Sequence, residues 1–170
     1  MSKKYELTSE TTQTINGETL YRIKALRDFG DVKAGDLGGW VESESNLDHV
    51  GDCWVFDNAE VSGDARVYGD AWVFDNAQVY GYARVSGDAW LSGDAWVYKK
   101  SHIITFSGFG SLARTTTAFK TEASFHISCG CFKGTLEEFR AAISETHGDN
   151  KFGREYKLIA DLIELHFSEE

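Results

Sequence analysis

The sequence lacks any long apolar run, and no stretch reaches the roughly 18 residues that a membrane-spanning helix needs. The opening residues MSKKYELTSE lack the apolar stretch of a secretory signal. Cysteine is scarce, and three cysteines are an odd number, which argues against a disulfide framework. We therefore expect a cytoplasmic protein with reduced thiols and no membrane partner. Its 170 residues suffice for one domain, or for a repeat domain with a small companion.

Basic residues are scarce in the middle of the chain. Residues 41–98 hold eleven acidic residues against only Arg66 and Arg84, whereas acids and bases nearly balance in residues 1–40 and 99–170. Nearly all of the formal net charge of −10 thus lies on the middle segment. Binding to a nucleic-acid backbone uses clustered Lys and Arg, so direct nucleic-acid binding is disfavoured. An acidic surface instead suits a partner protein with a basic surface.

A six-residue repeat organises the same segment. From Val55 it reads VFDNAE, VSGDAR, VYGDAW, VFDNAQ, VYGYAR, VSGDAW, LSGDAW and VYKKSH. Val or Leu recurs at the first place and Ala at the fifth, so that Ala-x-Val puts two apolar side chains on one face of a short strand. The Gly-Asp or Asp-Asn pair between them is typical of a turn. Each repeat is therefore predicted to form one strand and one corner.

This pattern resembles the hexapeptide-repeat proteins, in which an inward aliphatic residue follows a small residue by two positions, as in Ala59-x-Val61. The resemblance covers about a third of the chain and implies a left-handed parallel β-helix, a triangular β-solenoid with 18 residues per coil. The left hand comes from the resemblance alone. The predicted fold class is mainly β, with an N-terminal cap, a solenoid and a C-terminal unit in residues 1–40, 41–102 and 103–170.

The two flanking segments predict a hairpin cap and a small α+β unit. Residues 5–27 contain Asn16-Gly17, a strong turn signal between two strand-like runs. A cap is expected, because an open solenoid end exposes its core and its strand edges. After the repeats, three strand-like segments precede two helices, the first opening at a capping box of Thr135 and Glu138. The predicted C-terminal order is β-β-β-α-α.

Residues 18 apart should stack at about 4.8 Å and build rows of like side chains on the coil. Large exposed aromatic patches generally mark an interface. Three interpretations stay open for the aromatic column: packing against the protein's own terminal segments, the seam of a homo-oligomer (dimer or trimer), or a partner site. The predicted aromatic column contains Trp54, Trp72 and Trp90, flanked by Phe56 and Phe74. The predicted acidic rows contain Asp52, Asp70 and Asp88 at one corner and Asp57 and Asp75 at another.

A Gly-rich segment supplies a candidate site for phosphate or a small nucleotide. Backbone amides, hydroxyls and a guanidinium can together bind phosphate. The segment matches neither a Walker loop nor a dinucleotide fingerprint, and a turn between two strands explains the glycines as well. The candidate residues are Ser107, Gly108, Gly110, Ser111, Arg114 and Thr115.

Four residues near the C-terminal strands have side chains that bind zinc. Two thiolates and two imidazoles suit a tetrahedral site, but Cys-x-Cys differs from the recurrent Cys-x-x-Cys. A buried free cysteine is ordinarily a small hydrophobe, so the sequence predicts no cofactor. The weak candidate ligands are His126, Cys129, Cys131 and His147.

Many hexapeptide-repeat proteins are acyltransferases with a histidine base, and His49 or His102 would have to serve here. The repeats contain no protruding loop to wall a substrate pocket, and no orienting carboxylate is assigned to either histidine. The sequence therefore predicts a non-enzymatic binding protein, with an acyltransferase as the alternative enzyme class.

The whole chain resembles uncharacterised proteins of bacteriophages and prophages that join acidic hexapeptide repeats to an SCGCF-type segment. This resemblance implies a bacterial host. The leading hypothesis is that the acidic coil imitates a nucleic acid and inhibits a host antiphage defence protein, with a small-nucleotide binder as an alternative. The opposing interpretation is that Asp is simply common at turns. The matching residues are Cys129, Gly130, Cys131, Phe132, Gly134, Glu138, Phe139, His147 and Tyr156.

Overall fold

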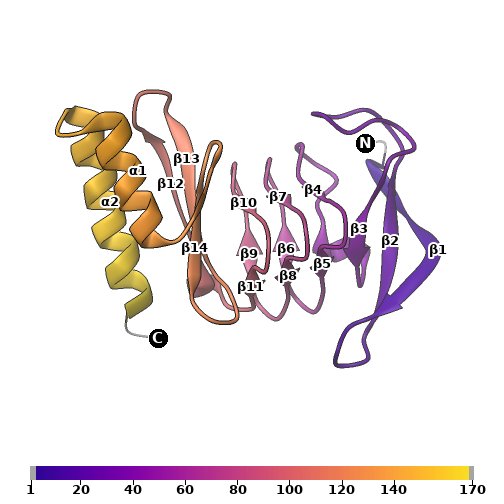
Figure 1. Ribbon diagram of the computed structural model, residues 1–170. Coiled ribbons are helices and arrows are strands. Elements are labelled where there is room, and N and C mark those ends of the chain that lie inside the picture. The colour runs from indigo at the N-terminus through magenta and orange to yellow at the C-terminus, as the bar shows by residue number, and fades with distance from the viewer. Residues whose placement is uncertain (1–2, 169–170) are drawn as a thin grey trace.

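The computed structural model describes residues 3–168, and its fold is mainly β. A hairpin lies at one end of an elongated molecule, a coil of short strands follows, and a sheet backed by two helices closes the other end (Figure 1). None of the helices within the described residues combines the length and the apolar character needed to cross a bilayer.

The six-residue repeats form the predicted coil, with one short strand for each repeat. Residues 18 apart pair in parallel, so that Trp54 lies beside Trp72 and Trp72 beside Trp90. The 18-residue coil is thus confirmed, while its left hand stays a prediction. The strands are β4 (Trp54–Val55), β5 (Glu60–Val61), β6 (Arg66–Val67), β7 (Trp72–Val73), β8 (Gln78–Val79), β9 (Arg84–Val85), β10 (Trp90–Leu91) and β11 (Trp96–Val97).

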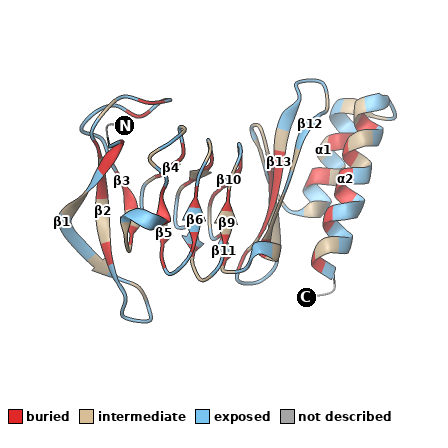
Figure 2. Cartoon of the chain, turned by 180° about the vertical axis from the view of Figure 1, so that it is seen from behind, coloured by how far each residue is buried: buried red, intermediate tan, exposed pale blue. Residues whose placement is uncertain are grey.

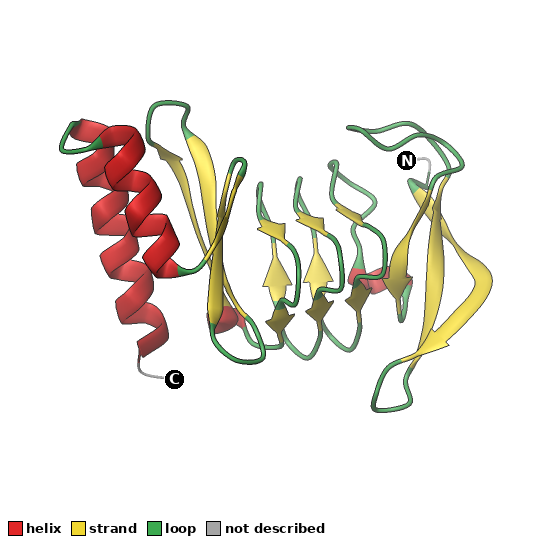
Figure 3. Ribbon diagram, in the orientation of Figure 1, coloured by secondary structure: helices red, strands yellow, loops and turns green. Residues whose placement is uncertain are grey.

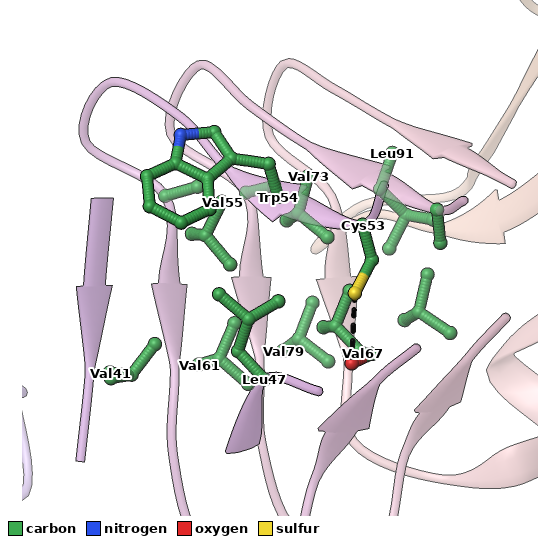
Figure 4. Close-up of a cluster of buried hydrophobic side chains, with 14 of the residues drawn as sticks. Val41, Leu47, Cys53, Trp54, Val55, Val61, Val67, Val73, Val79 and Leu91 are labelled. Carbon is green, nitrogen blue, oxygen red and sulfur yellow. Dashed lines mark hydrogen bonds between the residues drawn. The ribbon is translucent and has the colours of Figure 1, made fainter. Parts of the chain in front are cut away.

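Apolar side chains fill the inside of the coil. The Val, Leu and Ala of the repeats are at most 1% exposed, and Figure 2 shows buried residues beside exposed or partly exposed ones along the short strands. Val61, Val67 and Val73 reach the interior from three different faces (Figure 4). Cys53 occupies an alanine position of the repeat and is buried like its counterparts. Burying each valine stabilises the coil by roughly 2 kcal/mol, before the entropy of ordering the chain is counted.

Each corner of the coil needs a left-handed backbone, which Gly, Asn and Asp adopt most easily. Asp57 and Asp75 have φ of 51° and 60°. Two corner carboxylates also bond backbone N–H groups of a neighbouring coil. Asp70 accepts from the N–H of Asp52, and Asp75 accepts from the N–H of Gly93, both at 2.9 Å. Corner carboxylates therefore tie successive coils together.

The predicted N-terminal hairpin is present. β1 (Tyr5–Gln13) pairs antiparallel with β2 (Thr19–Ala25), and Gly17 in the turn has φ of 86°. β3 (Leu37–Val41) pairs with β2 on one side and with β5 on the other, so the hairpin continues one sheet of the coil. At Gly39, an added Cβ would lie 2.5 Å from a backbone oxygen of the first coil. Only glycine allows the cap to approach the coil this closely.

The C-terminal unit contains one strand more than the sequence predicted. The predicted third strand is a hairpin, because Gly130 (φ 60°) turns the chain and places Cys129 opposite Phe132. The prediction β-β-β-α-α is therefore corrected to four strands and two helices. The strands are β12 (Ile103–Phe109), β13 (Arg114–Lys120), β14 (Phe125–Cys129) and β15 (Phe132–Gly134), and the helices are α1 (Leu136–His147) and α2 (Lys151–Ser168).

The sheet of β12 to β15 lies between the coil and the helices (Figure 3). On the coil side, the Ser128 hydroxyl donates to the carbonyl oxygen of Trp90 at 2.9 Å, and the N–H of Trp90 donates to Thr117 Oγ1 at 3.2 Å. The predicted capping box of Thr135 and Glu138 opens α1. The helices and the sheet enclose a second apolar core of their own. Both ends of the coil are thus covered.

Candidate functional site

The aromatic column stacks as the repeat predicted, although the chain itself covers part of it. The Trp72 and Trp90 rings are parallel within 4°, with centroids 5.4 Å apart. Trp54 instead turns toward the N-terminal cap, packs edge-on against Tyr5 and Phe29, and is only 1% exposed. The prediction that Trp54 belongs to an oligomer or partner interface is wrong, because the N-terminal cap already covers the Trp54 ring. Intramolecular packing is the interpretation that fits Trp54.

The other end of the aromatic column meets the C-terminal unit. Lys133 Nζ lies 4.2 Å from the centroid of the Phe74 ring, a cation–π contact that covers this ring. Phe56 packs against Trp72, and both are only partly exposed. Trp90 is still 37% exposed. The column therefore offers a narrow strip around Trp90 rather than a continuous face.

All five members of the acidic rows are exposed. Asp52, Asp70 and Asp88 lie in line along one corner. Each precedes a strand of the row β4, β7 and β10, and these strands pair with a register of 18 residues. Two members of the rows, Asp70 and Asp75, accept backbone hydrogen bonds while remaining at the surface. The rows thus have a structural use and also concentrate negative charge on two edges of the coil.

The Gly-rich segment forms the hairpin between β12 and β13, with Gly108 and Gly110 in left-handed backbone. Its polar groups are largely engaged within the protein. The amide of Gly110 donates to a Glu155 carboxylate oxygen at 3.1 Å, and the hydroxyls of Ser107 and Thr115 bond each other at 2.9 Å. The negative Glu155 carboxylate occupies the Gly110 amide and would repel a phosphate there. The loop is therefore not preformed for phosphate binding.

Arg114 begins the second strand of the same hairpin and pairs with Phe109. An added Cβ on Gly130 would come within 2.5 Å of its guanidinium, so the arginine packs against the bare glycine backbone. Arg114 also lines a hollow of about 230 Å³ between the sheet and the helices. The remaining lining residues of this hollow are Ser111, Leu112, Cys129, Cys131, Phe132, Phe139, Ala142, Ile143, Thr146, His147 and Tyr156.

Three of the four candidate zinc ligands line that hollow, but His126 is not among its lining residues. Cys129 instead accepts a hydrogen bond from the Thr116 hydroxyl at 3.2 Å. Burial, followed by the nearby Cys129 thiol, raises the pKa of Tyr156 to about 12. Within residues 3–168, no group of three or more suitable side chains has a metal-binding arrangement.

The two histidines considered as acyltransfer bases have unsuitable surroundings. Nδ1 of His49 accepts a hydrogen bond from the N–H of Lys4 at 3.2 Å, which leaves the ring proton on Nε2 in the neutral form. Nε2 in turn lies 3.7 Å from the Glu44 carboxylate, so the prediction that no carboxylate lies beside either histidine is corrected for His49. His102 is only 4% exposed and packs edge-on against Tyr98. Neither ring offers an exposed nitrogen as a base.

One feature of the surface was not predicted from the sequence. A groove of about 340 Å³ runs between the tip of the N-terminal hairpin and the face of β5, β8 and β11. Trp96, Tyr80 and Glu60 line it on the coil side. Burial raises the pKa of the Glu60 carboxyl. The repeat places these side chains on one face, but the groove exists only because a distant hairpin lies across it.

Comparison with known proteins agrees with the geometry of the coil. Residues 59–75 and 77–93 match the family model described as YdcK beta solenoid repeat. Over 55 aligned residues, the chain is 40% identical to the uncharacterized acetyltransferase YdcK of Escherichia coli (strain K12). This alignment covers 28% of the chain and only 17% of the relative's own length. The repeat segment is a β-solenoid of the hexapeptide-repeat type, as predicted.

Proposed function

We propose that the protein is a non-catalytic binding protein whose acidic rows occupy a basic surface of a partner protein in a bacterial host. The observation that supports this most is the register of 18 residues, which repeats exposed carboxylates from coil to coil at about 4.8 Å. Arg66 and Arg84 are the only basic residues among residues 41–98, so little of this charge is neutralised locally. Such a surface steers association with a basic partner.

A groove that normally holds a nucleic-acid backbone is the basic surface that fits these rows best. Proteins that handle nucleic acids bind the phosphates through clustered Lys and Arg. Occupation of that groove by a rigid acidic coil would block the nucleic acid. The resemblance to phage and prophage proteins supports a host defence protein as the partner, and inhibition as the effect. Nucleic acid itself is not a ligand in this proposal.

Replacing all five acidic-row residues by asparagine tests the proposal, because asparagine keeps the shape and the acceptor oxygen and removes the charge. Asparagine also tolerates the left-handed backbone of the corners. We expect the folded coil to persist and partner affinity to fall at least about tenfold in roughly 50 mM salt. The measurement is capture from bacterial lysate with the immobilised protein, followed by titration of the captured protein. The row variant carries D52N, D57N, D70N, D75N and D88N.

A matched control removes five exposed acids outside the coil, which changes the net charge equally. We expect this control variant to retain the partner. Equal loss in both variants would reduce the effect to overall charge, and full retention by the row variant would contradict the proposal. The control variant carries E6Q, E10Q, D31N, E122Q and E145Q.

An acetyltransferase is the alternative suggested by the name of the relative from Escherichia coli. The chain spans 17% of that relative, and the surroundings of His49 and His102 give no exposed base. A small nucleotide beside Arg114 is the alternative ligand, although Glu155 engages the nearest loop amide. Turnover of acetyl-CoA by the purified protein would favour the enzyme over the binding protein.

Self-association is proposed through α2, with a second copy of the chain as the occupant. Leu158, Leu162 and Leu165 recur at helical spacing and are 70%, 47% and 61% exposed. Antiparallel packing of two α2 helices would cover these leucines. Asp161 and Glu164 pair with Arg140 of α1 in the same chain, at 2.7 and 2.8 Å, so the apolar stripe of leucines carries this proposal.

The variant Leu162→Glu is expected to convert this dimer to a monomer, since a charge would enter the centre of the apolar stripe. Light scattering coupled to size exclusion measures the mass at several concentrations. Trp90→Ala is the matched control on the aromatic column and should stay dimeric. A monomeric wild-type protein, or a dimer broken only by Trp90→Ala, would contradict the α2 seam.

A further inference from the structure

The groove beneath the N-terminal hairpin continues a column of side chains on one face of the coil. Strand pairing places Trp40 beside Glu60, Glu60 beside Gln78, and Gln78 beside Trp96. The column therefore reads aromatic, carboxylate, amide, aromatic, at about 4.8 Å per step. The hairpin tip faces the last three members across the groove. Its contributing residues are Thr14, Ile15, Asn16 and Glu18.

A cation already covers the first ring of this column. The guanidinium of Arg22 lies 4.9 Å from the centroid of the Trp40 ring. The molecule uses the same contact elsewhere, with Lys133 over Phe74 at 4.2 Å. Trp96 is 37% exposed, and Tyr80 and Tyr98 pack against its ring with centroids 5.9 and 5.1 Å away. Lys99 and Lys120 line a hollow beside it, but no cation–π contact involves Trp96 within residues 3–168. The Trp40 end of the column thus carries a cation over its ring, whereas the Trp96 end has no cation–π contact within residues 3–168.

The charges that line the groove are of one sign. Glu60 and Glu18 are its ionisable carboxylates, and no Lys, Arg or His of the described chain lines it. Glu18 accepts a hydrogen bond from the Thr14 hydroxyl at 3.1 Å, whereas no hydrogen bond or charge partner within residues 3–168 acts on the Glu60 carboxylate. Burial raises the pKa of the Glu60 carboxyl. A partly buried carboxylate without a counter-charge is destabilised, and a cation would offset that cost.

The rim of the groove carries an apolar side chain fully open to water. Ile15, at the tip of the hairpin, is 99% exposed. The tip therefore presents one apolar contact beside the cationic subsite that Trp96 and Glu60 define. An arginine or lysine side chain has this mixed character, because its apolar stem precedes its charged head.

We propose that this groove binds an arginine side chain of the basic partner, with the guanidinium on the Trp96 ring and against the Glu60 carboxylate. The planar guanidinium stacks on an indole and meets a carboxylate with two donors, which a lysine ammonium does less well. Gln78, between the two, offers an amide oxygen to a further N–H. This inference rests on the proposed function for the partner's charge, but the groove residues are distinct from the acidic rows.

The test uses N-acetyl-arginine amide as the probe and N-acetyl-citrulline amide as its uncharged isostere. The Nε1–H signal of Trp96, assigned by its loss in Trp96→Phe, is followed by heteronuclear NMR at about 150 mM salt. We expect saturable shifts with the arginine probe at millimolar concentration, roughly the range of one anchoring side chain. Citrulline should bind about tenfold more weakly, and Glu60→Gln should weaken the arginine probe by a similar factor.

Glu145→Gln, on the exposed face of α1, is the matched control and should leave the arginine titration unchanged. Equal shifts with citrulline, unchanged binding in Glu60→Gln, or no saturable shift of Trp96 would each overturn the inference. The row variant separates the two proposals, since it should lose the partner but keep the arginine shift. If the row variant loses the partner but the arginine probe causes no shift of Trp96, the proposed function still holds. The arginine site in the groove would then be rejected.

Discussion

Replacing Val67 by aspartate is expected to abolish the folded coil. Val67 is fully buried and lies between Leu47 of the preceding coil and Val85 of the next. The new carboxylate would have no partner in this apolar interior, at a cost of several kcal/mol. Domains of this size are stable by only about 5 to 15 kcal/mol, so one such group removes much of the margin. Circular dichroism during heating should show no cooperative transition, or one lowered by tens of degrees.

Arg66→Asp is the matched control, because it places the same side chain one residue away, on the outer face of the strand. Arg66 is exposed, so we expect a change in the free energy of unfolding of at most about 0.5 kcal/mol. If Arg66→Asp unfolded the protein while Val67→Asp did not, the inward and outward faces assigned to the repeat would be reversed.

Replacing Gly39 by alanine is expected to detach the N-terminal cap. The added methyl would lie 2.5 Å and 3.0 Å from two backbone carbonyl oxygens and 2.7 Å from a Val55 methyl. Backbone oxygens cannot move without disturbing the coil, so we expect a destabilisation of about 3 kcal/mol. Because the cap buries Trp54, its detachment should shift the tryptophan emission to longer wavelength and make it accessible to iodide.

Gly87→Asn is the control for this substitution. Nothing lies within 4 Å of a Cβ built at Gly87, and its φ of 64° suits asparagine. Emission and melting temperature should stay close to those of the wild type. A Gly39→Ala protein as stable as the wild type, with Trp54 still protected, would show that the cap approaches the coil less closely than described.

The coil was predictable because its information is local. An apolar side chain every six residues and a turn pair between them determine which side chains face inward. The resemblance to hexapeptide-repeat proteins implied three strands, and so 18 residues, per coil. The same holds for the Asn16-Gly17 turn and for the capping box at Thr135 and Glu138, where a few neighbouring residues decide the backbone. Each of these predictions is confirmed.

Features that depend on docking between distant segments were not predictable. The sequence placed Trp54 on an outward column, but whether a ring is covered depends on where Tyr5 and Phe29 pack. Around Gly130, one strand and a tight hairpin have nearly the same sequence pattern, and tertiary pairing with β13 and β15 selects the hairpin. The groove at Trp96 likewise needs the hairpin to lie across it.

The acidic rows combine two roles that the sequence alone could not separate. Asp70 and Asp75 accept hydrogen bonds from backbone N–H groups of the coil, so part of their selection is structural. A backbone bond, however, needs only an acceptor oxygen, and asparagine supplies one. The backbone bond does not require a negative charge, and the proposed function explains why the charge is there. Exchange of Asp for Asn therefore removes the binding role and keeps the structural one.

The salt dependence of partner binding is the sharpest test of binding through the acidic rows. Association constants for the captured partner are measured for the wild type and the row variant between roughly 50 and 500 mM salt. We expect the association constant to fall steeply with salt for the wild type and much less for the row variant, because the five carboxylates make the salt-sensitive contacts. Parallel slopes, or wild-type binding indifferent to salt, would contradict it.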